Sequence, residues 1–86
     1  MVTKEVMVSN SKGLHARPAT LLVRKAASFK SDIGIEFMGK KANIKSLIGI
    51  LSLGVGPNNL VNVMANGADE KLALEEIIKL INSLEE

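Results

Sequence analysis

Two hydrophobic periodicities alternate along the chain, and together they allow few folds. Residues 2–8, 33–37 and 60–66 have alternating patterns that predict half-buried strands, with Val2, Val6 and Val8 on one side of the first. A further short strand fits residues 41–44. Residues 16–28 and 70–84 carry the i, i+3, i+4, i+7 spacing of amphipathic helices, and a short helix fits residues 47–53. The order βαββαβα favours an α+β fold, in which a four-stranded antiparallel sheet has three helices on one face.

Residues typical of helix ends mark where these helices begin and stop. Pro18 falls in a first turn, where its missing N–H costs nothing, and this puts His15 at or beside the N-cap. Ser46 can cap the short helix and Gly54 can end it. Asp69 can cap the last helix, whose predicted apolar stripe is Leu74, Ile77, Ile78, Ile81 and Leu84.

The composition predicts one domain, residues 1–86, with an aliphatic core. Hydrophobic residues make up 47% of the 86 residues, and there is no cysteine, so apolar burial instead of disulfides must stabilise the fold. The lack of cysteine suits a reducing cytosol. Lys4 and Glu5 stand where a signal peptide would be apolar, so we expect a cytoplasmic protein.

Several classes of function lack the residues that they need. With a single histidine and no cysteine, a protein zinc site has too few ligands, and no nucleotide-binding glycine motif occurs. Aromatic residues are 2% of the chain, too few to stack nucleic-acid bases, and the longest apolar stretch, residues 47–56, is too short to span a bilayer. We expect no cofactor, no direct nucleic-acid partner and no membrane insertion.

Charge is distributed unevenly between the two halves of the chain. Residues 1–45 hold nine Lys or Arg against three acids, whereas residues 46–86 hold two Lys against six acids. This asymmetry can orient an encounter with an acidic partner surface. Charge alone favours the simpler interpretation, two ordinary solvated faces.

The segment from Gly13 to Ala19, sequence GLHARPA, combines features suited to phosphoryl chemistry. A histidine at a helix N-terminus meets the positive end of the helix dipole, which favours the neutral ring and leaves a lone pair free to attack phosphorus. The first turn consists of Ala16, Arg17 and Pro18, and its backbone N–H groups can cradle phosphoryl oxygens, although Pro18 has no N–H to donate. The Arg17 guanidinium can bind the same oxygens. The alternative from spacing alone is an ordinary surface histidine near a helix start.

The segment GLHARPAT, residues 13–20, resembles the active-site motif of HPr, the histidine-containing phosphocarrier of the phosphoenolpyruvate:sugar phosphotransferase system. Residues 43–54, NIKSLIGILSLG, resemble the regulatory serine region of HPr from Gram-positive-type bacteria, and GADE at 67–70 resembles the turn into the last helix of the family. The resemblance implies an open-faced β-sandwich, and it implies that enzyme I phosphorylates Nδ1 of His15, with Arg17 binding the phosphoryl group. It also implies that the IIA domains of sugar permeases receive the group, so the chain would be a carrier and not an enzyme.

Ser46 has two interpretations that are compatible with each other. A serine N-cap contributes about 1 kcal/mol to a helix. The family resemblance adds phosphorylation by an HPr kinase/phosphorylase, and with it a link to catabolite control and to a catabolite-control transcription factor as a further partner. A phosphate at a helix N-terminus would place a charge of about −2 beside the apolar residues of 47–53 without unfolding the helix.

The helix at 47–53 has more apolar residues than one buried stripe can hold. We predict that Ile50 and Leu53 face inward, while Leu47, Ile48 and Leu51 face outward as part of a partner interface. The alternative is a helix buried on most sides. The full predicted interface adds residues of the first helix and one lysine and consists of Thr20, Arg24, Lys45, Leu47, Ile48 and Leu51.

The chain departs from the family pattern at Pro57-Asn58-Asn59, where a loop containing lysine is more usual. Two other functions stay open: the phosphocarrier of a regulatory, nitrogen-type phosphotransferase chain, and a binding module that acts mainly through the Ser46 surface. The Ser46 segment argues against the first alternative. The presence of His15 argues against the second as a sole role.

Overall fold

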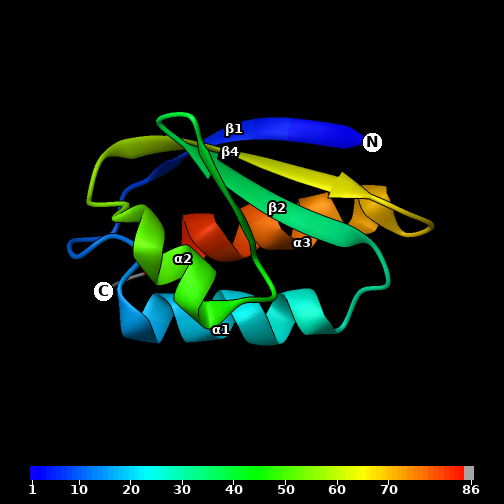
Figure 1. Ribbon diagram of the computed structural model, residues 1–86, viewed down its shortest axis with the longest axis horizontal. Helices are drawn as coiled ribbons and strands as arrows, with labels where there is room; N and C mark the ends of the chain where they lie inside the picture. The colour runs from blue at the N-terminus through cyan, green and yellow to red at the C-terminus, as the bar shows by residue number, and fades with distance from the viewer. Residues whose placement is uncertain (85–86) are drawn as a thin grey trace.

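The predicted element order is confirmed in the computed structural model, which describes residues 1–84 (Figure 1). Residues 85–86, at the end of the predicted domain, lie outside the described part. The elements in chain order are β1 (Val2–Val8), α1 (Ala16–Ala27), β2 (Asp32–Phe37), β3 (Lys40–Asn43), α2 (Leu47–Leu53), β4 (Asn59–Asn66) and α3 (Glu70–Ser83).

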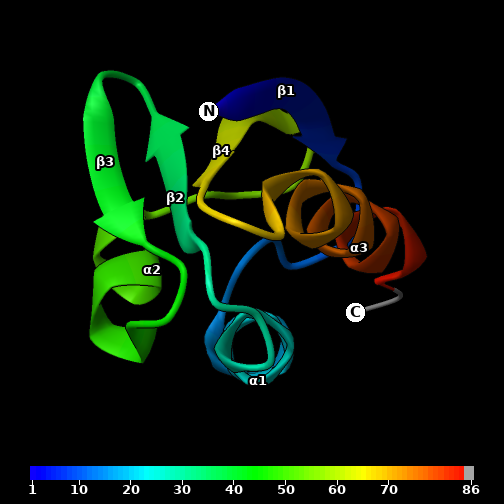
Figure 2. The same cartoon turned by 90° about the vertical axis from the view of Figure 1, so that its right-hand side faces the viewer.

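The four strands form one antiparallel sheet in the order β1-β4-β2-β3. The period-two pattern sets the register, because cross-strand partners such as Val6 and Val61, or Ile35 and Val63, are buried on the same side. Figure 2 views the molecule along its length, and the three helices lie on that side of the sheet. The expected α+β architecture, an open-faced β-sandwich, is therefore present.

Each helix contributes an aliphatic stripe to the core. Leu22 of α1, Ile50 of α2, and Ile77 and Ile81 of α3 have at most 1% of their surface exposed. Of the predicted α3 stripe, Leu74 and Leu84 are only partly buried, and Ala73 is buried in addition. The core holds one phenylalanine, Phe29, among aliphatic residues, as the composition predicted.

The capping predictions hold for α2 and fail for α3. Ser46 Oγ accepts a hydrogen bond from the Gly49 N–H at 3.1 Å, and Gly54 ends α2 in the left-handed conformation. The Asp69 side chain, however, makes no capping bond to α3. It accepts instead from the Ser31 hydroxyl and from the backbone N–H groups of Lys30 and Ser31, each at 2.9 Å. A long-range partner competes with the local one, and no local pattern could have revealed it.

These hydrogen bonds tie the start of α3 to the turn between α1 and β2. They hold the pKa of Asp69 at about 2, chiefly through the Ser31 hydroxyl and then through the Lys30 N–H, because they stabilise the carboxylate form. Glu70 accepts from the Gly67 N–H at 3.1 Å, which lowers the pKa of that carboxyl as well.

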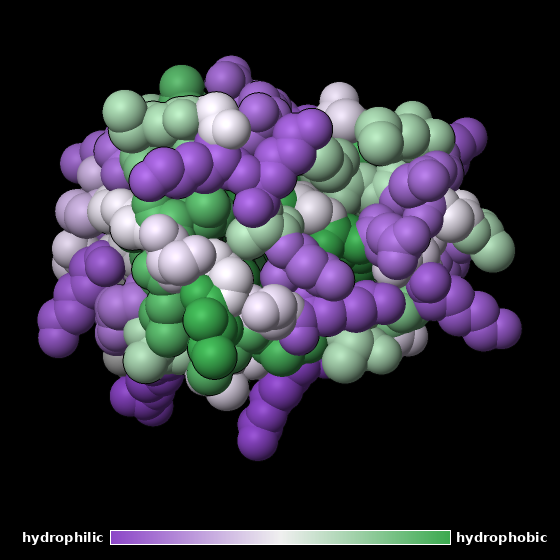
Figure 3. Space-filling view, viewed as in Figure 1, coloured by the Kyte–Doolittle hydropathy of each residue, from purple (hydrophilic) through white to green (hydrophobic). Residues whose placement is uncertain are grey.

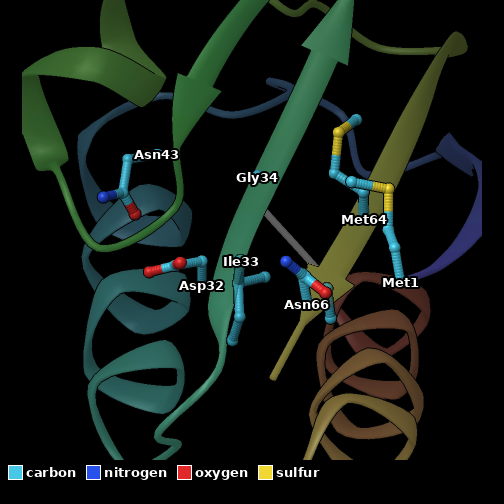
Figure 4. Close-up of a pocket in the computed structure, with 8 residues that line it drawn as sticks. Met1, Asp32, Ile33, Gly34, Asn43, Met64 and Asn66 are labelled. Carbon is cyan, nitrogen blue, oxygen red and sulfur yellow. The ribbon is translucent and has the colours of Figure 1, made fainter.

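The outer face of the sheet is uncovered and carries polar residues together with exposed Met7 and Leu60, which are cross-strand partners. A hollow of about 300 Å³ opens on this sheet where Gly34 has no side chain. Figure 4 shows Met1 and Met64 on one side of it, and Asp32 and Asn43 on the other. No predicted site residue lines the hollow, so it is separate from the site described below.

Candidate functional site

His15 is the N-cap residue of α1, as the position of Pro18 predicted. Its backbone is extended, and its side chain makes no capping hydrogen bond to the helix. The ring is half-buried, and Nε2 is enclosed with no hydrogen-bond partner among the described residues. Nδ1 is not among the enclosed atoms, so the two ring nitrogens differ in their surroundings.

The first turn of α1 lies directly after the histidine. The first helical hydrogen bond runs from the Ala19 N–H to the His15 carbonyl at 2.9 Å, so the N–H groups of Ala16 and Arg17 precede the helical ladder. Pro18 is buried and offers no donor, as expected. Such a helix start is an anion-binding environment, and Arg17 adds a permanent positive charge within two residues of the histidine.

The loop before His15 is fixed by close packing. Gly13 has φ +67°, and a Cβ on it would lie 2.4 Å from the Val55 carbonyl oxygen. Leu14 is 3% exposed and donates its N–H to that same oxygen at 3.0 Å. The segment after α2 therefore supports the residue next to the histidine.

The apolar residues of α2 divide as predicted. Ile50 and Leu53 are buried, whereas Ile48 is 81% exposed and Leu47 and Leu51 are exposed by 37% and 40%. Leu47, Ile48 and Leu51 are called the α2 patch from here on. Figure 3 shows apolar side chains gathered over α2, and α2 packs beside α1, which begins at His15.

Ser46 lies at the N-terminus of α2 and is half-buried. Its hydroxyl oxygen accepts from the Gly49 N–H, so the capping role is present. Ser46 directly precedes Leu47 in the chain, so a group added to the Ser46 hydroxyl would border the α2 patch.

The basic residues predicted for an interface differ in their availability. Arg24 is exposed in the last turn of α1. Lys45 is only half-exposed, and its ammonium donates to the Phe29 carbonyl at 3.0 Å, which ties the start of α2 to the end of α1. Thr20 is exposed on α1, and its hydroxyl donates to the Ala16 carbonyl at 2.7 Å. Arg24 is therefore the least constrained of the three.

Sequence reasoning missed the residues that support the histidine from behind. Asn10 is 4% exposed, and its Nδ2 donates to the Gly13 carbonyl at 2.8 Å. Val55, in the loop between α2 and β4, and Asn59, the first residue of β4, also belong to this support. Nothing in the sequence distinguishes these residues from others near a loop, and the departure at Pro57-Asn58-Asn59 was the one available signal.

Residues 1–84 contain no group of three or more His, Cys, Asp or Glu placed to hold a metal ion. None of the helices in this part of the chain combines the length and the hydrophobicity that a bilayer span requires.

Comparison with known proteins agrees with this geometry. Residues 2–83 match the family described as "PTS HPr component phosphorylation site". The structure of HPr-C-His from Thermoanaerobacter tengcongensis is similar at 44% identity and a TM-score of 0.94, covering 96% of this chain and 93% of that one. HPr from Bacillus anthracis is similar at 43% identity and a TM-score of 0.89, covering 92% of this chain and 94% of that one.

A third similar structure is that of the catabolite repression protein Crh from Bacillus subtilis, described as a swapped, intertwined dimer. It has 43% identity and a TM-score of 0.78, and the match covers 95% of this chain and 94% of that one. The family match spans nearly the whole chain, and the fold, the placement of the histidine and these structures agree with it. The chain therefore belongs to the HPr family of phosphocarrier proteins of the phosphotransferase system.

Proposed function

We propose that this chain accepts a phosphoryl group from enzyme I at Nδ1 of His15 and donates it to the IIA domains of sugar permeases. The observation that carries the proposal is the position of His15 as the N-cap of α1 with Nε2 enclosed. Enclosure of one nitrogen leaves the other as the nucleophile, and the helix start beside it suits a phosphoryl group.

The transfer exchanges one P–N bond for another. The Nδ1 lone pair of His15 attacks the phosphorus held on the enzyme I histidine, the P–N bond to that histidine breaks, and its electron pair returns to the departing ring. The N–H groups of Ala16 and Arg17, with the Arg17 guanidinium, stabilise the charge on the phosphoryl oxygens. The second transfer, to a IIA domain, repeats these steps with His15 as the leaving group.

Docking is assigned to the surface formed by the α2 patch and the exposed face of α1. The patch supplies desolvated contact area, and Arg24 steers an acidic partner, as expected of an apolar centre with a charged rim. Thr20 lies on α1 between His15 and Arg24 and belongs to the same face. Lys45 contributes mainly by holding α2 against α1, because its ammonium is bound to the Phe29 carbonyl.

Ser46 phosphorylation by an HPr kinase/phosphorylase is the proposed regulation of this surface. A phosphate on Ser46 would add a charge of about −2 next to the α2 patch and so repel the acidic partners that Arg24 attracts. The similarity to Crh, described as the catabolite repression HPr of Bacillus subtilis, favours a catabolite-control transcription factor as a further partner.

The carrier role is tested by mixing the protein with phosphoenolpyruvate, magnesium ion and enzyme I, and then adding a IIA domain. We expect an acid-labile, base-stable phosphate on the protein that disappears when the IIA domain is added. The variant His15→Ala is the control and should stay unlabelled. Labelled His15→Ala, or unlabelled wild type beside an active enzyme I, would sink the proposal.

The regulatory role needs a separate experiment with ATP and an HPr kinase/phosphorylase. We expect one acid-stable phosphate on the wild type and none on Ser46→Ala. The variant Ser52→Ala, which changes another hydroxyl of α2, is the matched control and should be labelled like the wild type. Equal labelling of Ser46→Ala and wild type would show that the assignment to Ser46 is wrong.

A further inference from the structure

Two loops that are far apart in the sequence meet behind His15. The histidine loop, residues 9–14, follows β1, and the support loop, residues 54–58, connects α2 to β4. Both lie at the end of the molecule where α1 begins, at the left of Figure 1. They are joined by the hydrogen bond from the Leu14 N–H to the Val55 carbonyl at 3.0 Å, and the Asn58 N–H donates to the carbonyl of Val8, the last residue of β1, at 2.6 Å.

Contact between the loops is as close as backbones allow. A Cβ on Gly13 would lie 2.4 Å from the Val55 carbonyl oxygen and 2.6 Å from the Gly56 Cα. The position of Gly13, and through Leu14 that of His15, therefore depends on the path of the support loop.

An asparagine side chain closes each loop. In the histidine loop, the Nδ2 of Asn10 donates to the Gly13 carbonyl at 2.8 Å. In the support loop, the Oδ1 of Asn59 accepts from the Gly56 N–H at 2.7 Å, so it fixes the residue that Gly13 touches. Asn58, which directly precedes Asn59, has φ +63°, a conformation that asparagine tolerates better than most residues.

We propose that Asn10 and Asn59 are positioning residues for phosphoryl transfer, which set the attack geometry of His15 because each of them closes one of the two loops that pack against each other. These two loops with their asparagine hydrogen bonds are called the clasp. The proposal rests on the proposed function, in which His15 is the phosphoryl acceptor. Neither side chain touches the incoming group. They act through Gly13, Gly56 and Leu14 on the backbone that carries the ring, and in-line transfer is sensitive to displacements of about 1 Å.

The clasp also links the transfer site to α2. The support loop begins at Gly54, where α2 ends, and α2 begins after Ser46. A change at the docking surface that moves α2 is therefore transmitted to the loop on which Gly13 rests.

The test compares three variants of β4 asparagines as acceptors from enzyme I, with kcat and KM measured separately. Asn59→Ala removes the acceptor for the Gly56 N–H, Asn59→Asp keeps an acceptor oxygen, and Asn62→Ala changes an exposed asparagine of the same strand. We expect Asn59→Ala to lower kcat by roughly tenfold at an unchanged KM, because docking residues are intact. Asn59→Asp should recover most of that loss, and Asn62→Ala should behave as the wild type.

A purely structural role for Asn59 would lower the melting temperature without this separation of kcat from KM. Three outcomes would overturn the clasp alone: a wild-type kcat for folded Asn59→Ala, a change in KM without a change in kcat, or no recovery of kcat in Asn59→Asp. An unlabelled wild type would overturn the proposed function and the clasp with it. If Asn59→Ala is unfolded at the assay temperature, Asn10→Ala replaces it, since this variant cuts the other hydrogen bond of the clasp and the same outcomes decide.

Discussion

Three features of the surrounding residues set the environment of His15. The ring is enclosed at Nε2, the helix start follows immediately, and the backbone before it is held by a glycine in the left-handed region. The sequence predicted the first turn of α1, because proline and the apolar spacing are local signals. It could not predict the contact of Gly13 with Val55, because that contact joins segments about forty residues apart.

Gly13→Ala tests this contact. The new methyl group would be strained by the positive φ and would also collide with the Val55 carbonyl, so we expect the free energy of unfolding to fall by roughly 2 kcal/mol or more. Chemical denaturation measures the change. Gly39→Ala is the matched control, because Gly39 also has positive φ but nothing lies within 4 Å of an added Cβ. It should cost only about 1 kcal/mol, and an equal cost at both positions would contradict the packing argument.

Among the elements, α2 is the one whose two faces have different tasks. Hydrophobic spacing indicated that not all its apolar residues could be buried. The division into buried Ile50 and Leu53 and an exposed α2 patch followed from the geometry of a seven-residue helix. The start of α3 shows the opposite case. Asp69 has the residue type of an N-cap and the right position, yet a turn thirty-eight residues earlier in the sequence binds its carboxylate.

Ile48→Glu tests the docking role of the α2 patch. Ile48 is 81% exposed, so we expect the free energy of unfolding to change by less than about 0.5 kcal/mol. The KM with enzyme I should rise by roughly fivefold or more, because a charge enters a desolvated contact. Leu72→Glu, at an exposed leucine of α3, is the matched control and should leave the KM unchanged. A similar KM rise in both variants would point to a general charge effect instead of a docking surface.

Asp69→Asn tests the tie between α3 and the turn after α1. Because the pKa of Asp69 is lowered to about 2 in the folded protein, its contribution to stability is present above the ordinary value of 3.8 and is lost as the pH falls towards 2. We expect the variant to unfold at a lower temperature near neutral pH and to lose less stability between those two pH values than the wild type. Thermal unfolding across that range measures both effects. Asp32→Asn, at an exposed aspartate of β2, is the control. If it reduced the dependence of stability on pH as much as Asp69→Asn does, the proposed link between α3 and the turn after α1 would be contradicted.

Across the whole molecule, the fold separates a sheet face open to solvent from a helical layer that carries the site. Alternation of strand and helix periodicities was sufficient to predict this layering, because each pattern can bury only one side of its element. The charges of the helices follow part of the asymmetry between the two halves of the chain. Helix α1 carries Arg17, Arg24 and Lys25 and no acid, whereas α3 carries three glutamates against Lys71 and Lys79. The two helices are linked by the Lys25–Glu76 ion pair at 3.1 Å.

Nitrogen-15 NMR of the phosphorylated protein tests most directly whether His15 carries the phosphoryl group on Nδ1. The protein is labelled at its single histidine and phosphorylated by enzyme I with phosphoenolpyruvate, and the phosphorus–nitrogen coupling identifies the bonded atom. We expect coupling at Nδ1 alone, because Nε2 is enclosed. Coupling at Nε2, or a phosphate that is stable in acid and located outside His15, would contradict this expectation.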